Sequence, residues 1–219
     1  MVEQRLRSGF IRFDYSGHGE SFPGPEQFGE THPGVWLEDA RAVLDKLTDR
    51  PQILVGSSYG ALLALHLAAE RPAQVAGLVL ASPALELDSR AWALLTAAQQ
   101  RALLGGSAAT IESGLIDCDT EVQGPSAVKI HFFREGRRLA LPTKPGSVQA
   151  ACPVRILHGS RDKVVPLESS LRLVRQLASD DVTMTVLKDA EHRLHRPREL
   201  EALAAAVLHL WGQLARRSS

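Results

Sequence analysis

Apolar and polar residues follow one another along the chain in blocks that predict strands and helices in turn. Short, almost wholly apolar runs are typical of buried strands, and longer segments with apolar residues three or four positions apart are typical of helices. The predicted strands cover residues 10–13, 53–55, 75–81, 154–158 and 182–187. The predicted helices cover residues 35–47, 61–69, 168–177 and 197–214. This alternation predicts an α/β fold with a mostly parallel sheet, right-handed crossovers and helices on both faces.

Residues 84–150 interrupt the alternation. They hold a helical pattern at 92–104, a glycine-rich turn, a polar stretch and an apolar run at 128–133. A connection of about 65 residues is too long for a plain loop inside a compact domain. We therefore predict a core made of residues 1–83 and 151–219, with 84–150 forming a small lid.

Composition narrows the classes of function. Lys+Arg and Asp+Glu both number 25, so the formal net charge is zero and no surface for nucleic acid is indicated. The chain has no run of 18 apolar residues and its first ten residues lack the apolar segment of a secretory signal, so we expect neither a membrane span nor secretion. Cys118 and Cys152 do not have metal-ligand spacing, and we expect both to be reduced in the cytoplasm.

The sharpest local signal is the pentapeptide Gly-Ser-Ser-Tyr-Gly at residues 56–60, between a predicted strand and a predicted helix. Strand, G-x-S-x-G, helix is the order of a nucleophile elbow, a cramped turn that holds a serine hydroxyl above the sheet edge. Side chains in place of the two glycines would crowd the strand–helix crossing. On this interpretation Ser58 is the nucleophile and the backbone N–H of Tyr59 stabilises an oxyanion. The alternative is an ordinary Ser/Gly turn.

Two more polar residues lie just past the ends of predicted strands. Asp162 follows strand 154–158, and His192 follows strand 182–187. The order Ser, Asp, His along the chain is that of a catalytic triad carried at the carboxyl ends of parallel strands. The chemistry needs these residue types, because an imidazole must accept the serine proton and a carboxylate must fix the imidazole tautomer. His195 is the competing candidate for the base.

Plainer interpretations remain beside the functional ones. Taken singly, Asp162 would fit a turn and His192 the entry to a helix. His18 lies between two glycines and either serves as a base or orders its own turn, and we favour the turn. The arginines within 134–138 either bind a substrate carboxylate or form a solvated basic turn, and we favour the solvated turn.

Several stretches resemble the α/β-hydrolase superfamily. They are Arg-Phe-Asp-Tyr-Ser-Gly at 12–17, Pro-Gln-Ile-Leu-Val-Gly-Ser-Ser at 51–58, Pro-Val-Arg-Ile-Leu-His-Gly at 153–159, and Ser-Asp-Asp-Val at 179–182 running on to Asp189, His192, Arg193 and Leu194. More closely, the chain is similar to the palmitoyl-protein thioesterase and acyl-glucuronide esterase group of mitochondrial abhydrolase-domain proteins and their bacterial relatives. The resemblance covers nearly the whole chain. It implies an α/β-hydrolase fold with Ser58 as nucleophile, Asp162 as orienter and His192 as base, and it makes a mitochondrial location possible if an upstream targeting segment has been lost.

One departure from this family concerns the N-terminus. Such hydrolases begin with two or three strands before the loop at 14–21, and one of these strands ends in a turn that supplies an oxyanion donor. Only nine residues precede Phe10, so we expect an N-terminally truncated chain that lacks a central strand. Because unpaired backbone groups at a buried edge are costly, we expect residues 10–13 to pair directly with strand 53–55 in a five-stranded sheet ordered as in the chain. The loop at 14–21 would then supply the lost donor.

Two functions follow from these observations. The first is a serine hydrolase that cleaves a carboxylic ester or thioester through an acyl-enzyme, without metal or cofactor. The second is a truncated, catalytically impaired chain that at most binds a partner. Losing one oxyanion donor costs about 10²–10³ in kcat, and losing a central strand threatens a net stability of only about 5–15 kcal/mol. Haloperoxidase or C–C hydrolase chemistry is a lesser alternative, because the same triad supports it.

Overall fold

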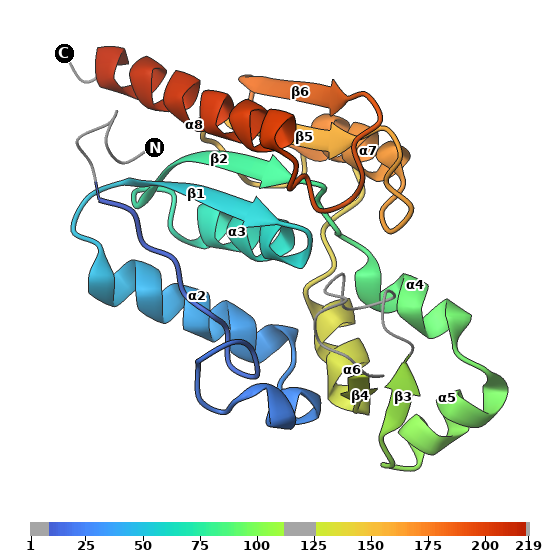
Figure 1. Ribbon diagram of the computed structural model, residues 1–219. Coiled ribbons are helices and arrows are strands. Elements are labelled where there is room, and N and C mark those ends of the chain that lie inside the picture. Colours follow the sequence, from blue (N-terminus) through green and yellow to red (C-terminus); the bar gives the residue numbers. More distant parts are fainter. Residues whose placement is uncertain (1–8, 112–125, 218–219) are drawn as a thin grey trace. The chain divides into compact units, whose positions relative to one another are not determined.

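Four parallel strands form the sheet that carries the candidate site (Figure 1). The computed structural model describes residues 9–111 and 126–217. The strands lie in the order β1-β2-β5-β6. Their bounds are β1 Gln52–Ser57, β2 Val75–Ala81, β5 Val154–Gly159 and β6 Val182–Leu187. All three pairings are parallel, so the predicted parallel sheet and four of its predicted strands are confirmed.

Helices cover both faces of this sheet. Helix α3 (Tyr59–Glu70) lies on one face and α8 (Pro197–Arg217) on the other (Figure 1). Successive strand residues point to opposite faces. In β5, Leu157 belongs to the core cluster that contains Leu210 of α8, whereas the next residue, His158, bonds to Ser170 of α7 (Leu167–Gln176). Helix α7 therefore covers the face opposite to α8.

The predicted strand at 10–13 is wrong. Within the described chain these residues belong to no strand, and β1 pairs with β2 alone, so the sheet has four strands and not five. The side chains of Phe10 and Ile11 are 64% and 44% exposed. An apolar run predicts a strand only where a neighbouring strand buries and pairs it, and this run has neither. The predicted direct pairing of residues 10–13 with β1 therefore fails.

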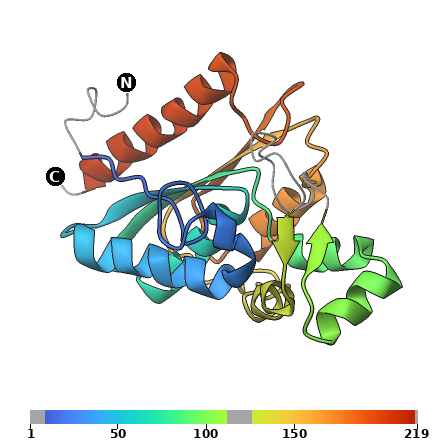
Figure 2. The same cartoon turned by 60° about the horizontal axis from the view of Figure 1, so that its bottom comes forward.

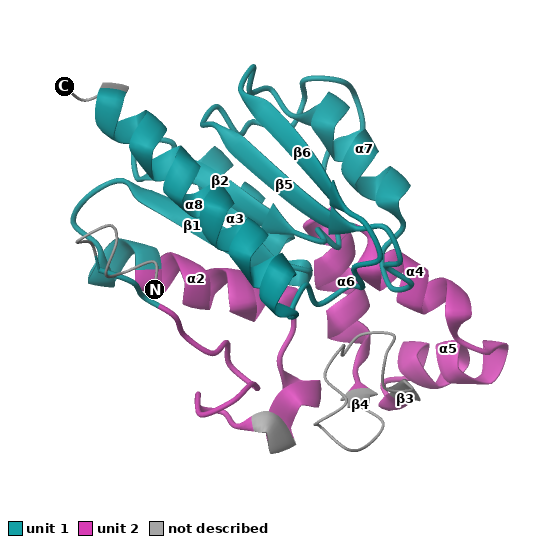
Figure 3. Ribbon diagram, turned by 45° about the horizontal axis from the view of Figure 1, so that its top comes forward, with its two compact units in different colours: residues 1–11, 44–85, 141–219 teal, residues 12–43, 86–140 magenta. Residues whose placement is uncertain are grey.

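The described chain divides into two compact units (Figure 3). Of the described residues, 9–11, 44–85 and 141–217 form the first unit, which contains the sheet. Residues 12–43, 86–111 and 126–140 form the second. The second unit contains most of α2 and the elements η1 (Pro25–Glu30), α4 (Leu87–Leu94), α5 (Ala97–Leu104), β3 (Ala109–Ile111), β4 (Ser126–Val128) and α6 (Ile130–Arg138). Helix α2 itself runs from Pro33 to Leu47. That 84–150 acts as a lid stays a prediction.

Within the second unit, β3 and β4 run side by side in opposite directions (Figure 2, green and yellow). The single helix predicted at 92–104 is broken into α4 and α5. The break has a local cause, because Thr96 and Gln99 form a reciprocal capping box that starts a new helix. His18 packs its ring against Phe28 and Trp36 at 5.2 Å between ring centroids, which supports the interpretation that it orders its own segment.

Candidate active site

Ser58 occupies a sharp turn between β1 and α3. Its backbone has φ 53° and ψ −121°, a conformation that non-glycine residues rarely adopt. The turn is fixed by backbone hydrogen bonds on both sides. The N–H of Ser58 donates to the carbonyl of Ala81 at 2.9 Å, and the N–H of Ala84 donates to the carbonyl of Ser58 at 3.1 Å. The strand, turn and helix of the predicted elbow are therefore present, with the serine at the turn itself.

Gly56 allows this turn to close. A Cβ at this position would lie 2.5 Å from the carbonyl oxygen of Gly60 and 2.8 Å from the backbone nitrogen of Ala61. These are backbone atoms of the helix that follows, and they cannot rotate away as a side chain could. These contacts support the steric reason that the sequence analysis gave for a glycine at position 56. Tyr59, the first residue of α3, follows Ser58 directly at the helix N-terminus, where the helix dipole favours negative charge.

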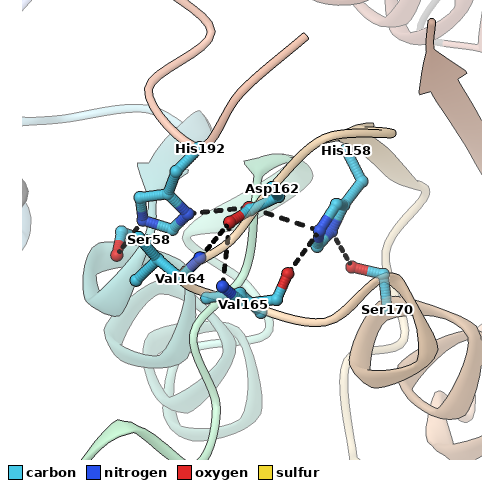
Figure 4. A network of polar contacts seen from close by, with 7 residues as sticks. All are labelled: Ser58, His158, Asp162, Val164, Val165, Ser170 and His192. Atoms are coloured by element: carbon cyan, nitrogen blue, oxygen red, sulfur yellow. Dashed lines mark hydrogen bonds and ion pairs between the residues drawn. The ribbon is translucent and has the colours of Figure 1, made fainter. Parts of the chain in front are cut away.

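Asp162 lies in the loop after β5, and its side chain is fully buried. One carboxylate oxygen, Oδ1, accepts hydrogen bonds from the backbone N–H groups of Val164 and Val165, at 2.9 and 2.8 Å. The other, Oδ2, lies 2.7 Å from Nδ1 of His192 (Figure 4). A buried carboxylate needs such partners to remain charged, and here both oxygens have them.

His192 joins the other two residues. It lies in the loop between β6 and α8, its side chain is 7% exposed, and its Nε2 lies 2.9 Å from Oγ of Ser58. The structure thus brings the three residues singled out in the sequence into one hydrogen-bonded chain, although Ser58 and His192 are 134 positions apart. His195, the competing base, is exposed, and within the described residues Ser58 contacts His192 instead.

The loops that carry Asp162 and His192 are tied to each other. The hydroxyl of Ser160 accepts a hydrogen bond from the backbone N–H of Asp189 at 2.8 Å, and the N–H of Arg161 donates to the carbonyl of Ala190 at 2.9 Å. Gly159 lets the loops approach, because a Cβ there would lie 2.3 Å from the carbonyl oxygen of Ala190. Sequence reasoning did not assign this role, since no local pattern shows which backbone will approach a glycine.

The environment of Asp162 favours its ionised form. Burial by itself raises the pKa of this carboxyl group, but hydrogen bonds from His158 and His192 and from the backbone N–H of Val165 outweigh burial. The net result holds the pKa of Asp162 well below its usual range. At neutral pH the carboxylate is therefore an acceptor for the imidazole N–H of His192, which fixes which ring nitrogen faces Ser58.

His158 is a second imidazole at this carboxylate, and the sequence analysis did not select it. It lies in β5 with its side chain fully buried, and its Nε2 is 3.3 Å from Oδ2 of Asp162. The signal that could have found it is a histidine directly before the glycine that ends a mostly apolar strand. The arginines within 134–138, interpreted from sequence as a basic turn, lie on α6, where Arg138 pairs with Glu135 at 2.7 Å.

Three further findings concern the described chain, residues 9–111 and 126–217. Within it, no group of three or more His, Cys, Asp or Glu side chains is arranged to hold a metal ion. No helix in this part is both long enough and apolar enough to cross a lipid bilayer. Cys152 is a free thiol, and Cys118 lies outside the described residues.

The family model described as serine aminopeptidase, S33 (Hydrolase_4), matches residues 7–199. The chain belongs to this family of α/β-hydrolases. The hydrolase is 33% identical over 211 residues to the mitochondrial palmitoyl-protein thioesterase ABHD10 of mouse, an alignment that covers 96% of this chain and 67% of the relative. It is 30% identical to the human protein of the same name, over 94% of this chain and 64% of the relative. The hydrolase thus spans about two thirds of the length of these curated relatives.

Solved structures agree with the fold. The hydrolase superposes on a putative hydrolase from Agrobacterium vitis S4 with a TM-score of 0.83 and 34% identity, over 95% of this chain and 78% of that one. For the mouse alpha/beta hydrolase domain-containing protein 10 the TM-score is 0.82 at 32% identity, over 97% of this chain and 81% of that one. The α/β-hydrolase fold expected from the sequence is therefore confirmed.

Proposed function

We propose that this chain is a serine hydrolase that cleaves a carboxylic ester or thioester through an acyl-enzyme. The observation that carries the proposal is the continuous chain of hydrogen bonds from Ser58 Oγ through His192 to the buried carboxylate of Asp162, at 2.9 and 2.7 Å. A serine hydroxyl is a weak nucleophile until a base within this reach accepts its proton. The relatives named as thioesterase and lipase support the same reaction class.

The geometry suggests the course of the reaction. Nε2 of His192 accepts the proton of Ser58 as Oγ attacks the carbonyl carbon of the substrate, and Asp162 stabilises the resulting imidazolium. The backbone N–H of Tyr59 donates to the oxyanion of the tetrahedral intermediate. The imidazolium then returns its proton to the departing alcohol or thiol, which leaves an acyl ester on Ser58. A water molecule, deprotonated by His192, hydrolyses that ester and releases the carboxylic acid.

We infer an acyl thioester as the first substrate to try, because the relatives that align along most of this chain are named palmitoyl-protein thioesterases. The same names carry the word mitochondrial, so they support a mitochondrial location over the cytoplasmic one expected from composition. No step of this mechanism requires a cofactor.

A fluorophosphonate probe and a palmitoyl thioester test the proposal on the purified chain. Ser58→Ala should abolish labelling and lower kcat by about 10³-fold or more, because the nucleophile is gone. Ser57→Ala is the matched control, since it removes a hydroxyl from the adjacent residue and should leave both measurements within a few-fold. Equal loss of labelling and kcat in the two variants would mean that Ser58 is the wrong serine of the pair.

A second function, binding without hydrolysis, is supported by one observation. In the described chain β1 pairs on one side only, so the strand that delivers Ser58 is an edge strand. If the folded wild-type chain neither accepts the probe nor hydrolyses the thioester, this second function is favoured. Stoichiometric labelling of the wild-type chain rules it out.

A further inference from the structure

We propose that His158 is a positioning residue of this site, which holds the Asp162 carboxylate on the side away from His192, and that Ser170 holds the imidazole of His158 in place through Nδ1. The inference rests on the function proposed above and adds two residues to it. Figure 4 shows the carboxylate between the two imidazoles, with Ser170 beyond His158.

The position of the ring hydrogen of His158 follows from the atoms that surround the ring. Nε2 lies 3.3 Å from Oδ2 of Asp162 and 3.0 Å from the carbonyl oxygen of Val165. Both oxygens only accept hydrogen bonds, so Nε2 must carry a hydrogen. Nδ1 lies 2.8 Å from Oγ of Ser170, whose hydroxyl can donate to it. With the hydrogen on Nε2, Nδ1 accepts a hydrogen bond from the Ser170 hydroxyl and all of these contacts are satisfied.

The contacts of His158 restrain Asp162 in two ways. Its N–H reaches Oδ2, the same oxygen that accepts from His192, and so opposes rotation of the carboxylate away from that imidazole. Its bond to the carbonyl of Val165 holds the loop whose N–H groups bind Oδ1. A buried apolar side chain of similar size would fill the space and supply neither restraint. Such supporting hydrogen bonds determine how accurately a catalytic group is held.

The ionisable side chain that faces both imidazoles is the Asp162 carboxylate, from the loop between β5 and α7. Helix α7 presents the uncharged Ser170 to His158. His158 therefore acts through Asp162 and not on the substrate, and its loss should lower kcat and leave KM nearly unchanged.

Two substitutions at position 158 separate positioning from packing. In His158→Leu the new side chain occupies the space of the imidazole but supplies no N–H to Asp162. We expect kcat to fall by about 10–100-fold, the usual effect of losing an outer hydrogen-bond partner. His158→Gln keeps an N–H near the place of Nε2, and we expect kcat within a few-fold of wild type. Thermal unfolding of both variants shows how much of each effect is stability.

Helix α7 offers a matched pair for the second half of the proposal. Ser170 and Ser169 are adjacent and both buried, but Ser169 accepts a hydrogen bond from Arg172 and does not contact His158 in the described structure. Ser170→Ala should lower kcat by about 3–10-fold, since about 1 kcal/mol is typical for one hydrogen bond, and Ser169→Ala should not. Because Ser170 acts through His158, Ser170→Ala should have no further effect on kcat in the His158→Leu background.

The proton on Nδ1 of His192 provides a readout that needs no turnover. Its downfield NMR resonance reports the hydrogen bond to Asp162, and we expect it to move or broaden in His158→Leu and Ser170→Ala and to remain in Ser169→Ala. The proposal is overturned if folded His158→Leu keeps the kcat and the resonance of wild type, or if Ser169→Ala and Ser170→Ala behave alike. Should His158→Leu not fold, His158→Gln and the serine pair decide. An inactive wild type would refute the proposed function, and the resonance would still test the positioning of Asp162.

Discussion

The substitution Gly159→Ala tests whether the close approach of two loops at Gly159 sets the position of His192. A Cβ at residue 159 would lie 2.3 Å from the carbonyl oxygen of Ala190 and 2.7 Å from that of Glu191. Ordinary contact for such a carbon begins at 3.4 Å, so the backbone at Ala190 must retreat by about 1.1 Å (3.4 minus 2.3). His192 follows two residues later in the same loop, so the displacement reaches the candidate base.

The expected loss of activity can be worked from these distances. Nε2 of His192 lies 2.9 Å from Ser58 Oγ, and a shift of about 1 Å takes it past the length of a useful hydrogen bond. A misplacement of this size costs about 10²-fold in rate. Overpacking a well-packed site also costs about 1–3 kcal/mol of the free energy of unfolding. The assay is kcat with a palmitoyl thioester beside a urea titration of the same variant.

Gly77→Ala is the matched control, because it adds the same methyl group to β2 of the same sheet. There the nearest atom is Cδ2 of Leu210 at 2.7 Å, the end of a buried side chain on α8 that can repack. We expect Gly77→Ala to lower the free energy of unfolding but to change kcat less than about threefold. If folded Gly159→Ala has a kcat for the thioester within twofold of the wild-type value, the close contact between the two loops does not set the position of His192 and the reasoning fails.

Two further predictions follow from the titrating groups. Because the folded pKa of Asp162 lies well below the ordinary value of 3.8, its ionisation stabilises the fold above that pH, and the stability is lost as pH falls toward the folded pKa. Free energies of unfolding of the wild type and Asp162→Asn should therefore converge as pH drops from about 4 to about 2, and curves that stay parallel would contradict this. Burial raises the pKa of the Cys152 thiol to about 11, so in a Cys118→Ser variant at pH 8 iodoacetamide should alkylate native protein at least about tenfold more slowly than urea-unfolded protein. Equal rates by mass spectrometry would contradict the raised pKa of this half-buried thiol.

The parts of the fold that could be predicted are those in which local pattern and tertiary burial agree. The apolar runs of β2 and β5 are buried on both faces, and such runs are typical of central parallel strands. Residues 10–13 have similar composition but no strand beside them, and composition does not show whether a partner exists. The break at Thr96 is visible in the sequence as Thr-Ala-Ala-Gln, a capping signal that the longer helical pattern around it hid.

The candidate site likewise has residues that the sequence predicts and residues that it does not. Ser58, Asp162 and His192 were singled out because each lies just past the end of a strand, and the carboxyl ends of parallel strands meet at one edge. His158 and Gly159 act through atoms that the chain brings close only when folded, the hydroxyl of Ser170 in one case and a backbone carbonyl in the other. No spacing in the sequence marks either contact. A polar residue and a glycine at the end of an apolar strand nevertheless indicate where to look.

The strand ends also explain how an edge strand can hold Ser58 in place. The residue after each of three strands donates its N–H to a residue at or near the end of the next strand: Ser58 to Ala81 at 2.9 Å, Ser82 to Leu157 at 2.8 Å, and Ser160 to Leu187 at 2.9 Å. These bonds form a continuous series across the carboxyl edge of β1, β2, β5 and β6. The series connects the turn at Ser58 to the strand ends that lead into the loops of Asp162 and His192. The bonds that fix the turn at Ser58 therefore come from the inner side of β1, where the ladder to β2 runs on to Ser57.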